Sequence, residues 1–129
     1  MSKAETEQLV KYMRKMQARL GLNEWRISLE IWDETELPST LGSESSGSIG
    51  HIQLWRPQHS AAIHVVAHPR DLSIRQVIRH ELAHLVLQDM WEAVKIIHEE
   101  LGRGTWQVLE NVYEQAEEIA ANRIMRALA

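Results

Sequence analysis

The sequence contains no cysteine, which excludes disulfide bonds, thiolate zinc fingers, iron–sulfur clusters and a cysteine nucleophile. Histidine and carboxylate side chains are therefore the only strong metal ligands, and seven histidines occur among 129 residues. Long apolar runs are also absent, since AAIHVVA and HLVL fall far short of a membrane span. The N-terminal 20 residues are charged throughout and lack the apolar core of a signal peptide. We therefore expect a cytoplasmic protein without a membrane partner.

Basic residues are fewer than acidic residues. The chain has 14 Lys and Arg against 18 Asp and Glu, a formal net charge of −4. An acidic chain is poorly suited to the phosphate backbone of nucleic acids. A metal-free helical regulator that binds nucleic acid through Arg70, Arg75 and Arg79 is an alternative that this charge disfavours. The length of the chain predicts a single domain, residues 1–129.

Hydrophobic periodicity predicts an α+β fold with an N-terminal helix, a small three-stranded sheet and a helical C-terminal half. Apolar residues recur at helical spacing in residues 3–20, and they alternate with polar residues in residues 24–32. Helices are predicted at 3–20, 74–90, 91–101 and 106–128, and strands at 24–32, 48–55 and 60–67. Because the strands are consecutive, we expect a largely antiparallel sheet. Residues 33–48 are polar and predict a surface loop, which either gates a cleft or links two strands.

Capping residues indicate where the C-terminal helices begin. Asp71 or Ser73 can cap the helix after the third strand, and Thr105 follows a GRG break and is the predicted N-cap of the last helix. The apolar face of residues 106–128 centres on Leu109, Val112, Ala116 and Ala120.

The predicted helix after the third strand carries the motif His80-Glu81-Leu82-Ala83-His84. Residues four apart lie on one helical face, about 6 Å apart along the axis, so both imidazoles can bind one ion. Glu81 is rotated by about 100° from His80, which suits a general base better than a ligand. The pattern predicts a zinc site, at which Glu81 takes a proton from a water that the metal activates. The alternative is a pair of histidines that merely share a face.

A catalytic zinc needs a third protein ligand and leaves one position for water. The residues after His84 offer several candidates. They are His98, Glu110, Glu114, Glu117 and Glu118. Glu118 lies far from the centre of the apolar face of its helix, and Glu117 lies at the edge of that face. Any one of these glutamates taken alone is more often a solvated surface charge.

The motif from His80 to His84, followed by Glu118-Ile119-Ala120-Ala121-Asn122 on a later helix, resembles the gluzincin metallopeptidases. The small size is similar to minigluzincins and to ImmA/IrrE-like phage or prophage peptidases. The resemblance implies a compact zincin-like domain, Zn²⁺ at one per chain, Glu118 as the third ligand and Asn122 as the partner that orients one histidine. SprT-like zincins take a third histidine instead, which makes His98 the alternative to Glu118. This chain has Ile124 where the family often has an aromatic residue.

The resemblance implies a zinc metalloendopeptidase that cleaves a protein or peptide substrate lying extended along the sheet edge. His64 and His68, on the strand before the motif, and Tyr113, on the last helix, are candidates for contact with the substrate or its oxyanion. A structural role is the more frequent one for each. The alternative function is a zinc-binding interaction or regulatory module with little or no proteolysis.

Overall fold

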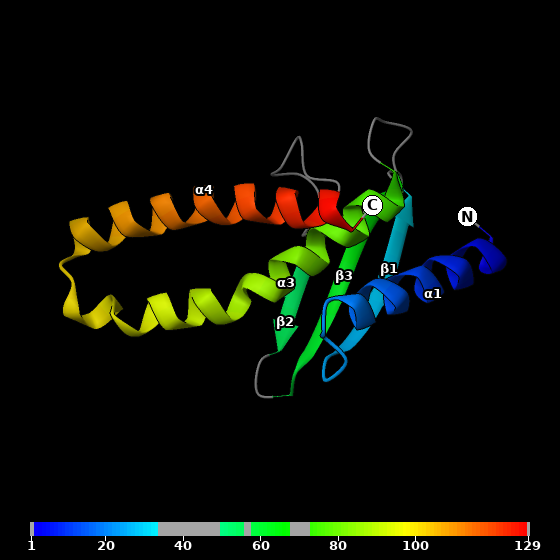
Figure 1. The fold of residues 1–129 in the computed structure, drawn as a ribbon, viewed down its shortest axis with the longest axis horizontal. Coiled ribbons are helices and arrows are strands. Elements are labelled where there is room, and N and C mark those ends of the chain that lie inside the picture. Colours follow the sequence, from blue (N-terminus) through cyan, green and yellow to red (C-terminus); the bar gives the residue numbers. More distant parts are fainter. Residues whose placement is uncertain (1, 34–49, 56–57, 68–72, 129) are drawn as a thin grey trace.

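The computed structural model describes residues 2–33, 50–55, 58–67 and 73–128, and it confirms the predicted α+β class. The described elements, in chain order, are α1 (Lys3–Arg19), β1 (Arg26–Asp33), β2 (Gly50–Trp55), β3 (Ser60–Ala67), α3 (Ile74–Ile96), the 3-10 helix η2 (His98–Glu100) and α4 (Arg103–Ala127) (Figure 1). Apart from Asp33, which ends β1, the predicted loop 33–48 lies outside the described residues.

The first helix begins and ends at residues that its sequence marks clearly. The Ser2 side chain accepts a hydrogen bond from the Glu5 backbone N–H at 3.2 Å, which caps the first turn. Gly21 follows the last turn with φ +71°, a conformation that glycine adopts without strain. The buried Gln17 side chain then donates to the carbonyls of Leu22 and Trp25 at 2.8 and 2.7 Å, which ties α1 to the start of β1.

The sheet has the order β1-β3-β2, and its predicted antiparallel character is only half right. β2 and β3 pair antiparallel, with Ile52 opposite Ile63, as a short connection between consecutive strands dictates. β1 and β3 pair parallel, with Leu29 opposite Ile63. The physical reason is the long segment between β1 and β2, since it lets β2 cross to the far side of β3. β2 is thereby an edge strand of the described sheet.

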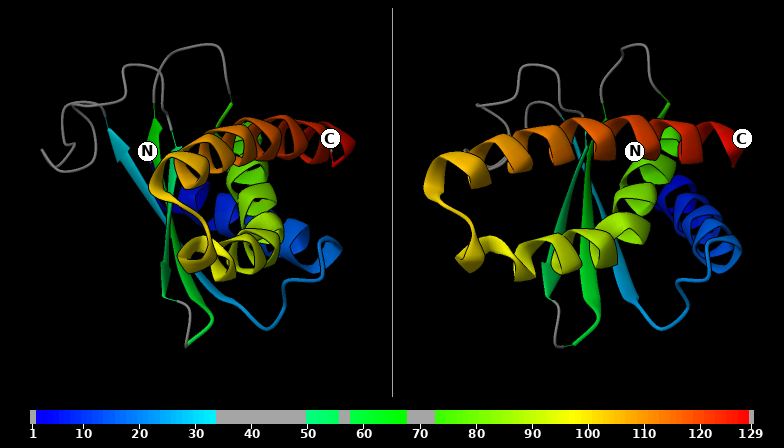
Figure 2. Two further views of the ribbon diagram at one scale, coloured as in Figure 1. Left: turned by 90° about the vertical axis from the view of Figure 1, so that its left-hand side faces the viewer. Right: turned by 60° about the vertical axis from the view of Figure 1, so that its left-hand side comes forward.

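The helices cover one face of the sheet, as the left view of Figure 2 shows. Ile27, Ile63 and Val65 on that face pack with Ile78 and Leu82 of α3, and all five side chains are buried. The helix α1 adds Met13 and Met16 to the same core, as the helical spacing of apolar residues in residues 3–20 predicts. The third helix is thus fixed against both the sheet and α1.

The C-terminal helices form an antiparallel hairpin whose tip extends beyond the sheet (Figures 1 and 2). Ser73 caps α3, and a reciprocal hydrogen bond from Gln76 completes a capping box. The helical stretch predicted at about 91–101 is helical over most of its length, but it is not a helix of its own, since α3 continues without a break to Ile96 and η2 follows at His98–Glu100. Thr105 does not cap α4; Gly102 is its N-cap residue, because the helix already begins at Arg103. None of the described helices combines the length and apolarity needed to cross a membrane.

The predicted apolar face of α4 lies partly in solvent, whereas Leu109 and Ala120 of that face are half-buried. Val112 is 57% exposed and Ala116 is also exposed, although both belong to the face that the sequence makes apolar. The buried residues of this helix are Trp106 and Ala121, on a side that is rotated by about 100° from the centre of that face. That side faces α3, and so this packing turns Glu117 and Glu118 toward the histidine motif.

Candidate metal centre

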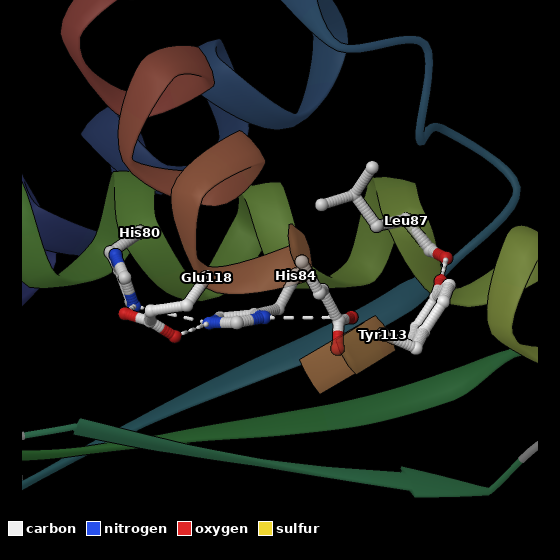
Figure 3. A network of polar contacts seen from close by, with 6 residues as sticks. His80, His84, Leu87, Tyr113 and Glu118 are labelled. Carbon is white, nitrogen blue, oxygen red and sulfur yellow. Dashed lines mark hydrogen bonds and ion pairs between the residues drawn. The ribbon is translucent and has the colours of Figure 1, made fainter. Parts of the chain in front are cut away.

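His80 and His84 project from one face of α3, one turn apart, as their spacing predicts (Figure 3). Their Nε2 atoms lie 3.1 Å apart, and their ring centroids are separated by 4.7 Å. Both side chains are 21% exposed, so the rings are largely sheltered while an approach from solvent stays open. Burial lowers the pKa of His80, and the neighbouring His84 lowers it further, while Glu118 and Asn122 act in the opposite direction. A neutral imidazole is the form that binds a metal.

Glu118 completes the group from the facing helix. Its Oε1 atom lies 3.0 Å from His80 Nε2 and its Oε2 atom 3.1 Å from His84 Nε2 (Figure 3). The three side chains offer ligand atoms that all lie within 4.8 Å of one another, an arrangement that could hold a metal ion. Ligands at 2.0–2.1 Å from a tetrahedral zinc lie roughly 3.3 Å apart, so the group needs only small adjustments to fit that ion.

Among the described residues, the other candidate ligands do not belong to this group, although Glu114 and Glu117 line the same cleft. The Glu117 carboxylate is 3.6 Å from His84 Nδ1, the ring nitrogen that faces away from Glu118. The Asn122 side chain lines the same cleft as His80 and acts to raise the pKa of that ring. Carboxylate and amide groups next to an imidazole can fix the orientation in which it binds a metal. His98 packs on Trp106 at the tip of the hairpin, with ring centroids 4.4 Å apart, and does not belong to the group.

Glu81 follows His80 directly in α3, and its side chain is buried, with 7% of the residue exposed. Burial, together with the negative charge of Glu118, raises the pKa of Glu81 to about 7 against the opposing effect of His84. A carboxyl group with this pKa can both take and release a proton near neutral pH. The side chain lines the same cavity as the histidines and Glu118.

Gly50 at the start of β2 is a residue of the site that the sequence did not reveal. A Cβ atom at this position would lie 2.4 Å from Val77 Cγ1 and 3.0 Å from Glu81 Oε1. Only glycine therefore lets the edge strand approach α3 so closely beside Glu81. The available signal was a glycine within a predicted strand, which often marks such an approach.

A cleft of about 1040 Å³ contains the group and is bordered by β2, α3 and α4. Tyr113 lines this cleft, and its hydroxyl donates to the Leu87 carbonyl oxygen at 3.3 Å (Figure 3). Burial and the nearby Glu117 raise the pKa of Tyr113, so the phenol keeps its proton. The hydroxyl thus serves the contact between α3 and α4 in this structure.

His64 does not meet this group, since it alternates along β3 with the buried Ile63 and Val65 and so lies on the sheet face opposite the helices. Its Nδ1 atom lies 3.1 Å from Glu30 Oε2, its Nε2 atom lies 3.2 Å from Gln53 Oε1, and its ring stacks on that of His51. His68 lies outside the described residues.

Two of the three arginines considered for nucleic acid binding contact neighbouring helices. Arg79 donates to the Tyr12 hydroxyl at 2.7 Å and to the Met125 carbonyl oxygen at 3.2 Å. Arg75 lies over the Tyr12 ring, 4.5 Å from its centroid. Arg70 lies outside the described residues. Arg75 and Arg79 thus connect α1, α3 and α4.

Comparison of the chain with protein-family models, with curated proteins and with solved structures finds no match in any of the three. The geometry around His80, His84 and Glu118 therefore carries the functional argument.

Proposed function

We propose that the protein is a zinc-dependent metallopeptidase of the gluzincin type. One observation carries the proposal: His80, His84 and Glu118 present their ligand atoms to one point, and the buried Glu81 lines the same cleft. Two imidazoles and one carboxylate from the protein are a donor set of catalytic zinc, which leaves a coordination position open. The motif on α3 and the later Glu118-to-Asn122 sequence are those that gave the resemblance to this class.

Each residue has a distinct task in the proposed reaction. Zinc, when bound, supplies a Lewis acid that lowers the pKa of water and polarises a peptide carbonyl. Glu81 takes the proton of the attacking water and passes it to the leaving amine. Glu117 orients the His84 ring, and Asn122 orients the His80 ring. The product is a pair of shorter peptides, formed by hydrolysis of one amide bond.

An extended peptide is the substrate that the cleft favours. β2 borders the cleft through Gly50, His51 and Ile52 and lies at the edge of the described sheet. An edge strand offers backbone N–H and C=O groups to an added strand. A peptide paired in this way would cross in front of the histidines of α3.

Metal analysis of the purified protein tests the first half of the proposal. We expect about one zinc per chain after purification without chelators, measured by mass spectrometry of the elements. The variants H84A and E118A should lose it, and H98A should retain it, because His98 lies at the hairpin tip. Retention of zinc by E118A together with its loss in H98A would assign the third ligand to His98 and overturn the proposed site.

Cleavage of a mixed peptide library tests the second half. The zinc-loaded protein should generate new amino termini, whereas E81Q should retain zinc and generate none. The matched control is E110Q, which removes a carboxylate from α4 that does not line the cleft. Stoichiometric zinc without any cleavage would refute the peptidase and favour a zinc-binding interaction module.

A further inference from the structure

The cleft has opposite charges toward its two ends. Glu114 and Arg126 both line it from α4, and they are 12 residues apart, or roughly 18 Å along the helix axis. Glu118 lies between them, roughly 6 Å from Glu114 and 12 Å from Arg126 along that axis. Within the described part of the chain, neither the Glu114 carboxylate nor the Arg126 guanidinium forms an ion pair. Both charges are thus free to pair with a ligand in the cleft.

The Glu114 end of the cleft also contains two aromatic rings. Trp91 of α3 and Tyr113 of α4 line it, with ring centroids 4.9 Å apart. The hydrogen bond from Tyr113 to the Leu87 carbonyl oxygen holds one ring in place. Aromatic faces beside a carboxylate bind cationic side chains, because the ring quadrupole and the negative charge both attract the cation. This end suits the side chain of lysine or arginine.

We propose that the cleft binds an extended peptide with a basic side chain at the Trp91–Tyr113–Glu114 end and an acidic side chain at the Arg126 end. An extended chain advances about 3.3 Å per residue, so 18 Å corresponds to five or six residues. Successive side chains point to opposite faces, so two that both face α4 are an even number of positions apart. The two charged side chains therefore flank the metal group from opposite sides, about six positions apart. This inference rests on the proposed function, since it takes the bond that is cleaved to lie at the metal group.

Binding to the zinc-loaded E81Q protein tests the inference without any need for turnover. The probes are fluorescent ten-residue peptides that carry Lys and Glu six positions apart, in both orders, and matched peptides with Gln in place of either or both charges. Fluorescence anisotropy gives the dissociation constants. Of the two peptides that carry both charges, we expect the tighter-binding one to bind about tenfold better than the peptide with Gln at both positions. A tenfold ratio of dissociation constants corresponds to two surface-accessible charge contacts.

Double-mutant cycles assign each charge to its partner. Adding E114Q to E81Q should weaken binding of the peptide with Lys about fivefold and leave binding of the matched peptide with Gln in place of Lys unchanged. Adding R126Q should weaken binding of the peptide with Glu about fivefold and leave binding of the matched peptide with Gln in place of Glu unchanged. The controls E110Q and R123Q, on the same helix but not lining the cleft, should change neither. Equal effects of E114Q on both peptides, no effect on either, or no binding of any peptide at millimolar concentration would overturn the inference.

The failure of the inference is distinguishable from the failure of the proposed function. Coupling of Glu114 to Lys and of Arg126 to Glu, without cleavage by the wild-type protein, would leave a peptide-binding cleft that is not a peptidase. Cleavage by the wild-type protein without either coupling would leave a peptidase that does not recognise charge in this way.

Discussion

Glu117 faces the side of the His84 ring that points away from Glu118: its Oε1 atom lies 3.6 Å from Nδ1, while Glu118 Oε2 lies 3.1 Å from Nε2. One imidazole thus contacts two consecutive carboxylates through its two nitrogens. Consecutive residues of a helix are rotated by about 100°, and His84 lies in the angle between them. The contact with Glu118 belongs to the candidate metal group, and the contact with Glu117 orients the ring.

This division predicts different effects for two neighbouring substitutions. E118A removes a ligand and should abolish stoichiometric zinc binding. E117A leaves all three ligands and should weaken zinc binding by about 10- to 100-fold, the usual effect of removing a partner that orients a ligand. Competition with a chromophoric chelator measures both, with E110A as the control. Equal losses in E117A and E118A would contradict the assignment of a single carboxylate ligand.

The raised pKa of Glu81 predicts how the stability of the metal-free protein changes with pH. Its folded pKa of about 7 lies above the ordinary value of 4.5, so folding favours the protonated form. The contribution to the free energy of unfolding is full below pH 4.5 and is lost as the pH rises through 7. Between pH 5 and pH 8 the loss should be about 2 kcal/mol. Urea unfolding in the presence of a chelator measures it.

The variant E81Q separates this effect from the titration of the histidines. Gln cannot ionise. Over the same pH range, the free energy of unfolding of E81Q should therefore fall by about 2 kcal/mol less than that of the wild type. Parallel pH profiles of the two proteins would show that Glu81 titrates normally when no metal is bound.

Local patterns predicted most of the secondary structure. The alternation in residues 24–32 and the helical spacing of apolar residues in residues 3–20 depend only on burial of one face, and the structure has both. The strand order was not predictable, because nothing local shows that β2 crosses to the far side of β3. The apolar face of α4 did not predict which side of this helix is buried, for a similar reason. The aromatic contacts of Trp106 and the polar cleft, not average hydrophobicity, set the rotation of this helix.

The sequence predicted the part of the candidate site that depends on residues close together in the chain. Helical spacing alone places His80 and His84 together, whereas the choice of Glu118 came from the resemblance. Proximity between α3 and α4 is a tertiary property, and in the structure it turns Glu118, not His98, toward the histidines. The orienting role of Glu117 and the close approach of Gly50 depend on the same packing, and the sequence offers a hint only for Gly50, as a glycine within a predicted strand.

The aromatic contacts of Trp106 predict that the hairpin tip can be weakened without loss of the metal group. Trp106 is 9% exposed and packs on Trp91 and His98. W106A should lower the free energy of unfolding by about 3 kcal/mol and increase hydrogen exchange at the tip. Zinc affinity should change little, because Glu118 lies roughly 18 Å farther along the helix. The control V108A, at a residue 64% exposed, should be close to neutral.

The close approach at Gly50 predicts a steric effect with its own rescue. In G50A the new methyl group meets Val77 Cγ1 at 2.4 Å and Glu81 Oε1 at 3.0 Å, so β2 must move or Glu81 must turn. We expect a loss of about 1–3 kcal/mol in the free energy of unfolding, as for other overpacked sites, together with reduced peptide cleavage. Adding V77A removes the clashing methyl group and should restore cleavage in part. G104A is the matched control, since its Cβ would have no atom within 4 Å. A G50A protein with the stability and cleavage of G104A would show that β2 does not press against Glu81.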